Sequence, residues 1–210
     1  MTSRREPLSL LLVVLGVLAW SWIGPHDRLT WWLEALPVLV ALPALLLSWR
    51  RFPLTPLLYR VIALHMIVLL VGAHYTYALT PPGFWVQEWF GLMRNPYDRF
   101  GHMLQGITPA LLARELLLRL RVVERRGWVL FLAACVALAF SAFYELLEWG
   151  AAMAYGASAE HFLAMQGDVW DTQWDILMAL LGALAALLLF GPLHHRQMAA
   201  IQRKAPPNLP

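Results

Sequence analysis

Long apolar runs alternate with short polar segments along the whole chain. Apolar runs of about 17–25 residues can cross the ~30 Å hydrocarbon core of a bilayer as helices. The chain has six such runs, over residues 8–24, 31–48, 57–79, 99–118, 128–148 and 173–192. We therefore predict an all-α fold, a polytopic transmembrane helix bundle of about six spans that forms a single integral membrane domain over residues 1–210.

The fourth run is the least apolar of the six, and hydropathy alone would miss it. Its polar residues are His102, Gln105, Thr108, Arg114 and Glu115. The neighbouring runs and the charge pattern still favour a span here. We expect the Arg114 and Glu115 side chains, near its inner end, to reach the membrane interface along their aliphatic stems.

Composition also favours a membrane location. Charged residues make up 14% of the 210 residues and the mean hydropathy is +0.58, whereas soluble domains carry about 25% charged residues. The N-terminal segment is charged and then apolar without a small-residue cleavage site, so we interpret it as an uncleaved first span. Cys135, the one cysteine, lies within an apolar run, which excludes a disulfide within the chain and a cysteine metal site.

Basic residues are distributed unequally between the two sides of the predicted bundle. With the N-terminus in the cytoplasm, 13 of the 16 Lys and Arg residues fall on the inner side, and the other 3, Arg28, Arg94 and Arg99, on the outer side. The positive-inside rule then places both termini in the cytoplasm. The sequence pI of about 9.4 reflects this asymmetry, so nucleic-acid binding has no support.

Acidic residues collect on the predicted outer side, which holds ten of the thirteen. Those at span ends stand at helical spacing: Asp98 with His102 (i, i+4), Glu145 with Glu148 (i, i+3), and Asp168, Asp171 and Asp175 (i, i+3, i+7). Consecutive spans with short connections usually pack as neighbours. We therefore expect these side chains to converge on one outward-facing cavity, with His74 at the outer end of the third run.

Carboxylates this close together cannot all stay ionised without compensation. A divalent cation provides it, and mixed carboxylate and imidazole ligands suit Zn, Mn or Fe better than Ca. The predicted metal ligands are His74, Asp98, His102, Glu145, Glu148, Asp168, Asp171 and Asp175. We predict Glu145, Asp175 and Arg99 as catalytic groups, with Arg99 either paired with a carboxylate or holding an anionic substrate.

Structural roles stay open for several of these residues. The segment NPYD (95–98) is typical of a helix start, with Asn95 as the N-cap and a proline in the first turn. Asp168 and Asp171 could be ordinary acids of the first helical turn, which interact with the helix dipole. Glu148 could lie at the water boundary, and His74 could form an interfacial hydrogen bond.

End-capping does not account for the remaining polar residues inside the spans. Asp175, Glu145 and His102 each lie about one turn or more within a predicted helix. An ionisable group at the bilayer centre costs about 2.5–3.5 kcal/mol on insertion scales, and less near the interface. We therefore predict a function for these three, and we expect His65, near the middle of the third run, to hydrogen-bond to a neighbouring helix instead.

Three stretches resemble the YjdF-type inner-membrane proteins of bacteria: YDRFGHMLQGITPALLARE (97–115), SAFYELLEWG (141–150) and QGDVWDTQWDILMALLGALAALL (166–188). They cover most of the second half, whereas the first 80 residues resemble the family mainly in hydrophobic layout. The resemblance implies a multi-pass protein of the bacterial inner membrane. Members of the family have no known function, so the resemblance implies no reaction.

Three functions fit these observations. The leading one is a metal-dependent membrane hydrolase or transferase that acts at the outer leaflet on a lipid, isoprenoid-phosphate or envelope substrate. The second is a cation- or proton-coupled transporter, with His65 as the main midplane candidate and no visible repeat. The third is a non-catalytic envelope or assembly protein whose acids organise helix ends.

Overall fold

Helices account for the regular structure of residues 5–156 and 160–203, the part of the chain that the computed structural model describes. In chain order they are α1 (Arg5–Trp22), α2 (Arg28–Ser48), α3 (Pro56–Tyr75), the 3₁₀ helix η1 (Tyr77–Leu79), α4 (Pro81–Phe90), α5 (Tyr97–Arg119), α6 (Arg126–Tyr155), α7 (Glu160–Leu163), α8 (Asp171–Leu189) and α9 (Gly191–Gln202). The all-α prediction is confirmed. Arg4 and Lys204, two of the charges counted on the inner side, lie outside the described residues.

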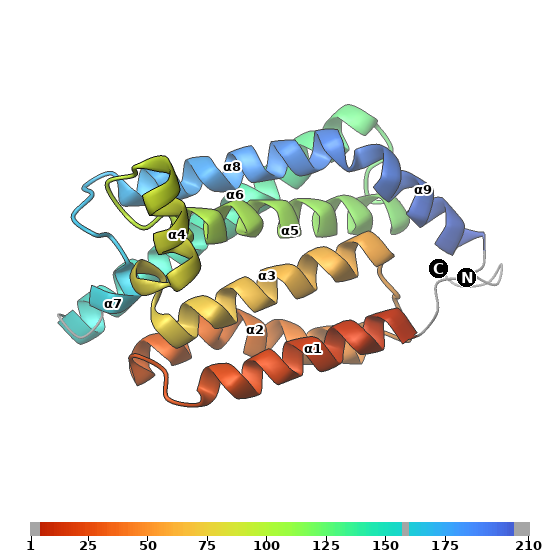
Figure 1. The fold of residues 1–210 in the computed structure, drawn as a ribbon. Coiled ribbons are helices and arrows are strands. Elements are labelled where there is room, and N and C mark those ends of the chain that lie inside the picture. The colour runs from red at the N-terminus through yellow and green to blue at the C-terminus, as the bar shows by residue number, and fades with distance from the viewer. Residues whose placement is uncertain (1–4, 157–159, 204–210) are drawn as a thin grey trace.

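The long helices run side by side in one bundle, in which α1 begins and α9 ends at the same end (Figure 1). We call this the termini end, and we call the other end, where α4 and α7 lie, the α4 end. Five helices, α1, α2, α3, α6 and α8, are long and apolar enough to cross a membrane. α5 has 23 residues and also runs along the bundle. With α5 the number of passes is even, which agrees with two termini at one end.

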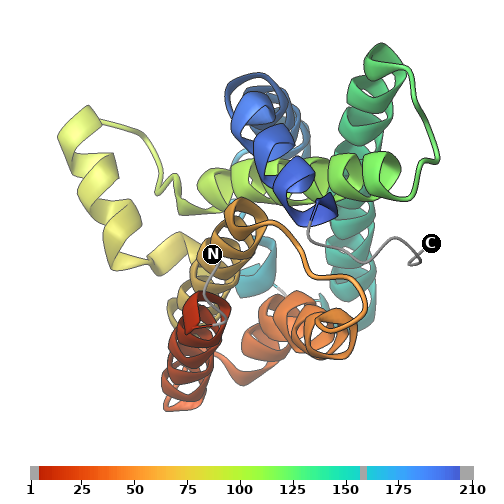
Figure 2. The same cartoon turned by 90° about the vertical axis from the view of Figure 1, so that its right-hand side faces the viewer.

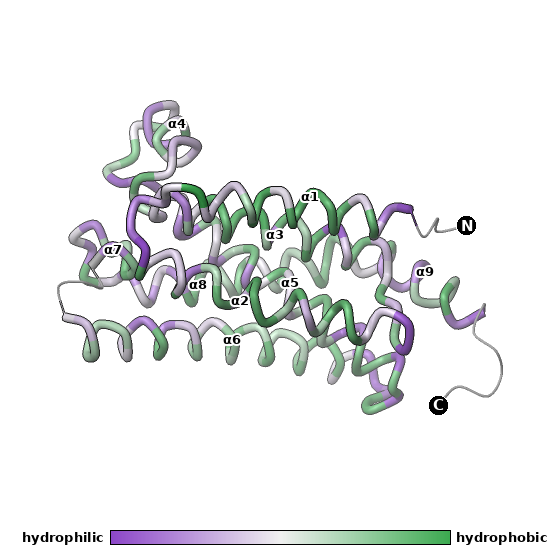
Figure 3. The backbone as a smooth tube through the Cα atoms, turned by 90° about the horizontal axis from the view of Figure 1, so that it is seen from below, coloured by the Kyte–Doolittle hydropathy of each residue, from purple (hydrophilic) through white to green (hydrophobic). Residues whose placement is uncertain are grey.

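The interior position of α5 explains why its sequence is so polar. α5 packs against α3 on one side and against α6 and α8 on the other, while α1 and α2 pack on α3; Figure 2 shows this arrangement end-on. Hydrophobic residues follow the middle of the helices, and hydrophilic residues gather at both ends of the bundle (Figure 3). The other helices therefore cover α5, and its polar side chains meet protein rather than lipid.

His65 illustrates this burial. Its Nδ1 lies 3.1 Å from the Thr108 Oγ1 of α5, so the expected hydrogen bond to a neighbouring helix is confirmed. Such a bond satisfies one polar group on each helix within the bundle.

Several helix boundaries differ from the sequence prediction by a few residues, and two of the differences have a clear physical cause. α6 continues to Tyr155, well beyond the predicted end at residue 148, because the segment 150–155 is rich in Ala, the strongest helix former. Gly156, with φ of +57°, ends it. The predicted sixth span ran to residue 192, but α8 ends at Leu189 and α9 begins with Gly191 and Pro192. Proline is favoured in the first turn of a helix, where its missing N–H has no intrahelical partner, which suits a helix start at Gly191 and Pro192.

A side-chain cap fixes the start of α2, and a side-chain hydrogen bond precedes the start of α5. Asp27 accepts a hydrogen bond from the Thr30 N–H at 2.7 Å. Burial raises the pKa of Asp27, but the hydrogen bonds from Thr30 and the nearby His161 and His26 together outweigh it, so the pKa lies below its ordinary value. Asn95 Oδ1 accepts from the Tyr97 N–H at 3.0 Å, although the N-cap position of α5 is Pro96 and the helix begins one residue later than predicted.

Glycines bring α5 and α8 close together. A Cβ on Gly106 of α5 would overlap the backbone carbonyl of Ala179 on α8, and a Cβ on Gly182 would overlap that of Met103. Small residues at such positions let two helix backbones approach each other. Gly106 stands one turn after His102, and Ala179 one turn after Asp175, so this contact sets the separation of those two polar side chains.

The expectation that Arg114 and Glu115 extend along their stems to the membrane interface was wrong, because both side chains are buried within the bundle at the termini end. Glu115 is fully buried and accepts hydrogen bonds from Thr55 Oγ1 at 2.8 Å, Arg119 Nη1 at 2.6 Å and His194 Nε2 at 2.9 Å. Arg114 is 7% exposed. The helix ends around them supply polar partners inside the bundle, so neither side chain has to extend to the interface.

Candidate functional site

Five of the predicted ligands meet inside the bundle near its α4 end. They are Asp98 and His102 of α5, Glu145 and Glu148 of α6, and Asp175 of α8, and we call them the central cluster. The i, i+4 spacing puts Asp98 and His102 on one face of α5. His102 Nε2 lies 3.6 Å from Asp98 Oδ1 and 3.7 Å from Glu145 Oε1. His102 therefore stands between carboxylates from two helices.

Two overlapping sets of residues in the central cluster can hold a metal ion. The first set is Asp98, His102 and Asp175, and the second is His102, Glu145 and Glu148. Within each set, every residue offers one ligand atom, and these atoms lie within 4.8 Å of one another. Metal–ligand bonds of about 2.0–2.2 Å place tetrahedral ligand atoms ~3.3–3.6 Å apart, close to the two distances from His102. The donor set, imidazole and carboxylate without sulfur, suits Zn, Mn or Fe.

Buried polar atoms of the central cluster lack hydrogen-bond partners among the described residues. These atoms include His102 Nδ1, Glu145 Oε1 and Asp175 Oδ1. His102 is 3% exposed and Asp175 2% exposed, so bulk water does not reach them. A buried polar group without a partner costs about 1–3 kcal/mol. The unsatisfied atoms therefore favour a bound ion, ligand or internal water at this position.

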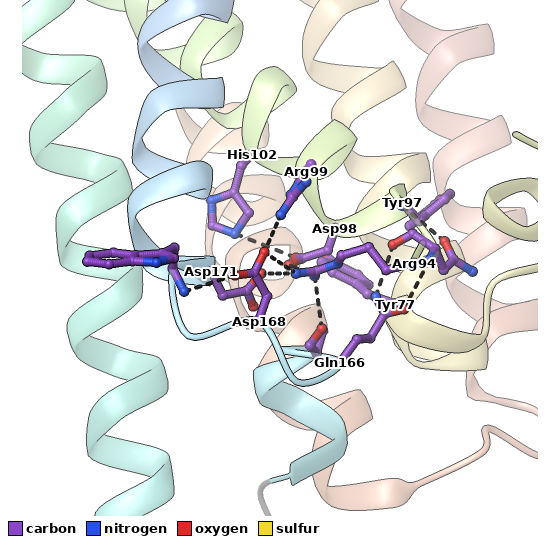
Figure 4. Close-up of polar contacts among 12 residues, drawn as sticks. Tyr77, Arg94, Tyr97, Asp98, Arg99, His102, Gln166, Asp168 and Asp171 are labelled. Atoms are coloured by element: carbon purple, nitrogen blue, oxygen red, sulfur yellow. Dashed lines mark hydrogen bonds and ion pairs between the residues drawn. The ribbon is translucent and has the colours of Figure 1, made fainter. Parts of the chain in front are cut away.

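Two arginines neutralise the acids that lie closest to the α4 end (Figure 4). Arg94 forms an ion pair with Asp171, and its guanidinium lies 3.6 Å from Asp168 and 3.8 Å from Asp98. Arg99 Nη2 donates to Asp168 Oδ2 at 2.7 Å. Of the two roles expected for Arg99, the structure shows pairing with a carboxylate.

Arg94 is a site residue that sequence reasoning missed. The distribution of basic residues placed Arg94 on the outer side but did not connect it with the acids. Its i, i+4 relation to Asp98 was a signal, but α5 begins only at Tyr97, so helical periodicity does not cover Arg94. Its position depends on tertiary contacts: the Gln166 side chain accepts from the Asn95 N–H and donates to the Asn95 carbonyl, both at 2.9 Å.

Glu34 of α2 is a second missed residue. It is 1% exposed, and neither carboxylate oxygen has a hydrogen bond of normal geometry among the described residues, although the backbone N–H of Tyr77 lies near it. It lies near enough to Asp98 for the two carboxyl groups to interact electrostatically. Tyr77 of η1 is also buried with an unpartnered hydroxyl, and burial, together with the charge of Glu34, raises the pKa of Tyr77 well above its ordinary value. The phenol therefore stays protonated and offers a hydrogen-bond donor.

The remaining predicted ligands have other partners. Asp168 Oδ1 accepts from the Trp170 N–H at 2.9 Å, just before α8, and Asp171 is the first residue of that helix. Both therefore combine ion pairing with the helix-start role that was their structural alternative. His74 Nδ1 lies 3.2 Å from the Ser21 carbonyl oxygen, at the contact of α3 with α1. His74 belongs to neither ligand set, and its observed contact is the hydrogen bond that was its structural alternative.

The acids thus fall into two groups, which differ in whether basic side chains compensate their negative charge. Asp168 and Asp171 have arginine partners, and Asp98 shares Arg94 with them. Glu145, Glu148 and Asp175 have no Lys or Arg ion-pair partner within residues 5–156 and 160–203. The carboxylates without a basic partner are therefore confined to the central cluster, and only there could a divalent cation compensate their charge.

Comparison with known proteins places the chain in a family. Residues 6–196 match the family model described as "Predicted membrane protein (DUF2238)". The chain belongs to this family. It is 52% identical over 201 residues to the inner membrane protein YjdF of Escherichia coli (strain K12). The aligned region covers 94% of this chain and 96% of the relative. The resemblance to YjdF-type proteins, inferred from three stretches of the second half, is confirmed over nearly the full length.

The DUF2238 description names a membrane protein and no reaction. No solved structure matches the chain. This DUF2238 member is therefore a multi-pass membrane protein of unknown function, and its chemistry has to be inferred from the central cluster.

Proposed function

We propose that this protein is a metal-dependent hydrolase or transferase of the bacterial inner membrane, with the central cluster as its metal site. The observation that carries the proposal is the convergence of His102 with carboxylates from α5, α6 and α8, among which buried polar atoms lack partners. The location in the inner membrane is inferred from the E. coli relative that is 52% identical.

The residues of the central cluster divide into ligands and acid–base groups. His102 is common to both ligand sets, so we assign it as the primary ligand, with Asp98 and Asp175 as its nearest set. A metal bound here supplies a Lewis acid for a phosphoryl or acyl oxygen and makes bound water a better nucleophile. Glu145 retains an oxygen without a partner and lies beside His102, which suits a group that accepts a proton from water.

The surroundings of the site suit a substrate that arrives from the membrane surface. α4 projects sideways from the bundle (Figure 2) and exposes Trp85, Trp89 and Phe90. Exposed aromatic side chains on a short helix are typical of a segment that lies along the membrane interface. Arg99, one quarter exposed in its side chain, lies at this end and can hold an anionic group. Lipid and isoprenoid-phosphate substrates fit this arrangement.

A non-catalytic assembly role is the second candidate, and the arginine pairs favour it. Arg94 and Arg99 tie the start of α5 to the start of α8, which is what acids that only organise helix ends would do. The transport hypothesis has less support, because His65, its midplane candidate, is engaged with Thr108.

A hydrolysis assay in proteoliposomes tests the proposed function. Purified protein is reconstituted with an isoprenoid diphosphate or phosphatidic acid, and phosphate release is measured before and after EDTA and after re-addition of Zn²⁺, Mn²⁺ or Fe²⁺. We expect release that EDTA abolishes and one metal restores. Glu145→Gln should lower the rate about a hundredfold or more, since general acid–base catalysis contributes roughly 10²–10⁴.

Glu88→Gln is the matched control, because Glu88 is an exposed acid on α4 at the same end of the bundle. It should leave the rate unchanged. Release that persists in EDTA, or equal rates in the Glu145→Gln and Glu88→Gln variants, would count against the proposal. Absence of release from both lipids would refute the hydrolase form of the proposal and leave the assembly role as the better account.

A further inference from the structure

A polar cavity lies at the termini end, far from the central cluster. It has a volume of about 110 Å³ and lies where the end of α5, the start of α6 and the end of α8 meet. Its lining combines two guanidinium groups with apolar side chains, chiefly Arg114, Arg126, Leu118, Leu130, Leu187 and Leu188. One water needs only about 10–15 Å³ of such space, so the cavity can accept a larger polar group.

Arg114 is buried there and forms no direct ion pair among the described residues, although the charge of Glu115 lies near enough to favour its guanidinium. Arg114 is 7% exposed, and its guanidinium donates to His194 Nδ1 at 3.0 Å and to the Gly191 carbonyl at 3.3 Å. A guanidinium can only donate, so Nδ1 of His194 carries no proton and the ring is neutral, with Nε2–H donating to Glu115. Glu115 in turn forms its ion pair with Arg119. Glu115 is therefore shared among Arg119, His194 and Arg114, and Arg114 has no carboxylate of its own.

Arg126 and the start of α6 add positive charge to the same cavity. Arg126 is the first residue of α6, and no side chain caps that helix start. The first backbone N–H groups of a helix and its dipole favour an anion. The charges of Arg114 and Arg126 repel each other, and no carboxylate lines the cavity within the described part of the chain. Two like charges held together in this way are stabilised when an anion lies between them.

The apolar part of the lining indicates what kind of anion fits. Leu188, which lines the cavity, is 70% exposed on the side of the bundle. The neighbouring Trp128 is 55% exposed at the start of α6, as an interfacial anchor is. The cavity thus has a cationic interior and a leucine-lined side that faces the membrane. A headgroup phosphate would lie between the arginines while its acyl chain follows the leucines.

We infer that this cavity binds the phosphate of an anionic phospholipid from the leaflet at the termini end, through Arg114, Arg126 and the start of α6. This site is separate from the proposed metal site, and neither depends on the other. Under the predicted topology it opens to the cytoplasmic leaflet. The lipid would neutralise Arg114 and hold the ends of α5, α6 and α8 together.

Native mass spectrometry of the full-length protein in detergent tests the inference. The protein is titrated with phosphatidylglycerol, with phosphatidylcholine and with inorganic phosphate, and the bound species are counted. We expect one phosphatidylglycerol to bind tightly and phosphatidylcholine at least about tenfold more weakly. Arg126→Gln should weaken phosphatidylglycerol binding about tenfold or more, because it removes a hydrogen bond between a guanidinium group and the phosphate.

Arg125→Gln is the control, because it removes the same charge from the adjacent residue, which does not line the cavity. It should bind phosphatidylglycerol like the wild type. Because Arg126 is exposed, its substitution leaves the fold intact, and thermal unfolding of both variants checks this. Competition by inorganic phosphate would support an anion site that also takes free phosphate. Equal binding by the Arg125→Gln and Arg126→Gln variants, or equal affinity for both lipids, would overturn the inference.

Discussion

At the scale of single residues, the important distinction is which acids have a cationic partner in the protein. The sequence showed a row of carboxylates and suggested one metal for all of them. In the structure, Arg94 faces Asp98, Asp168 and Asp171, and its side chain is only 11% exposed. Breaking a buried ion pair by removing one partner leaves an uncompensated charge, at a cost of about 3–5 kcal/mol.

Arg94→Gln should therefore lower the free energy of unfolding by about 3–5 kcal/mol, because it leaves Asp98 and Asp171 without a counter-ion. Arg99→Gln should cost about 1 kcal/mol or less, since Arg99 and Asp168 form a single, more exposed pair. Unfolding of the purified variants in detergent measures both values. Equal losses in the two variants would contradict the ion-pair account of the α4 end.

At the scale of helices, the contact between α5 and α8 positions the central cluster. Backbone carbonyls occupy the space that a Cβ on Gly106 or Gly182 would need. Because His102 and Asp175 each lie one turn from this contact, a change in helix separation moves the two side chains apart. Forcing extra atoms into such a packed contact costs about 1–3 kcal/mol.

Gly106→Ala should destabilise the protein by about 1–3 kcal/mol and weaken metal binding at the central cluster, since it pushes α8 away from α5. Gly150→Ala is the matched control: a Cβ at Gly150 of α6 meets no atom within 4 Å. It should be neutral or slightly stabilising, because Ala is the better helix former. Thermal unfolding and a metal titration of both variants measure the effects. Equal behaviour of the two variants would contradict the role given to the α5–α8 contact.

The pattern of apolar residues predicted the long apolar helices well. It also predicted that the spans carrying Asp98, Glu145 and Asp175 are neighbours, because consecutive helices with short connections pack together. It failed at α9 and at the end of α6, where a Gly-Pro pair and an Ala-rich segment decide the boundary. It also failed for Arg94 and Glu34, whose roles arise from contacts between segments distant in the chain. Such contacts leave no periodic signal.

At the scale of the whole molecule, polar chemistry lies at both ends of an otherwise apolar bundle. The α4 end contains the central cluster, and the termini end contains the arginine-lined cavity and the network around Glu115. α5 connects the two, since Asp98 and His102 lie near its start and Arg114 and Glu115 near its end. That the termini face the cytoplasm stays a prediction from the distribution of basic residues.

The metal content of the purified protein tests the central claim most directly. Wild-type protein and its variants are purified without chelator from cells supplied with Zn, Mn or Fe, and bound metal is measured by inductively coupled plasma mass spectrometry. We predict about one metal ion per wild-type chain, a loss of most of it in His102→Ala and Asp175→Asn, and wild-type content in Glu88→Gln. Wild-type protein without stoichiometric metal under every supplement, or His102→Ala and Asp175→Asn proteins that keep it, would contradict the metal site.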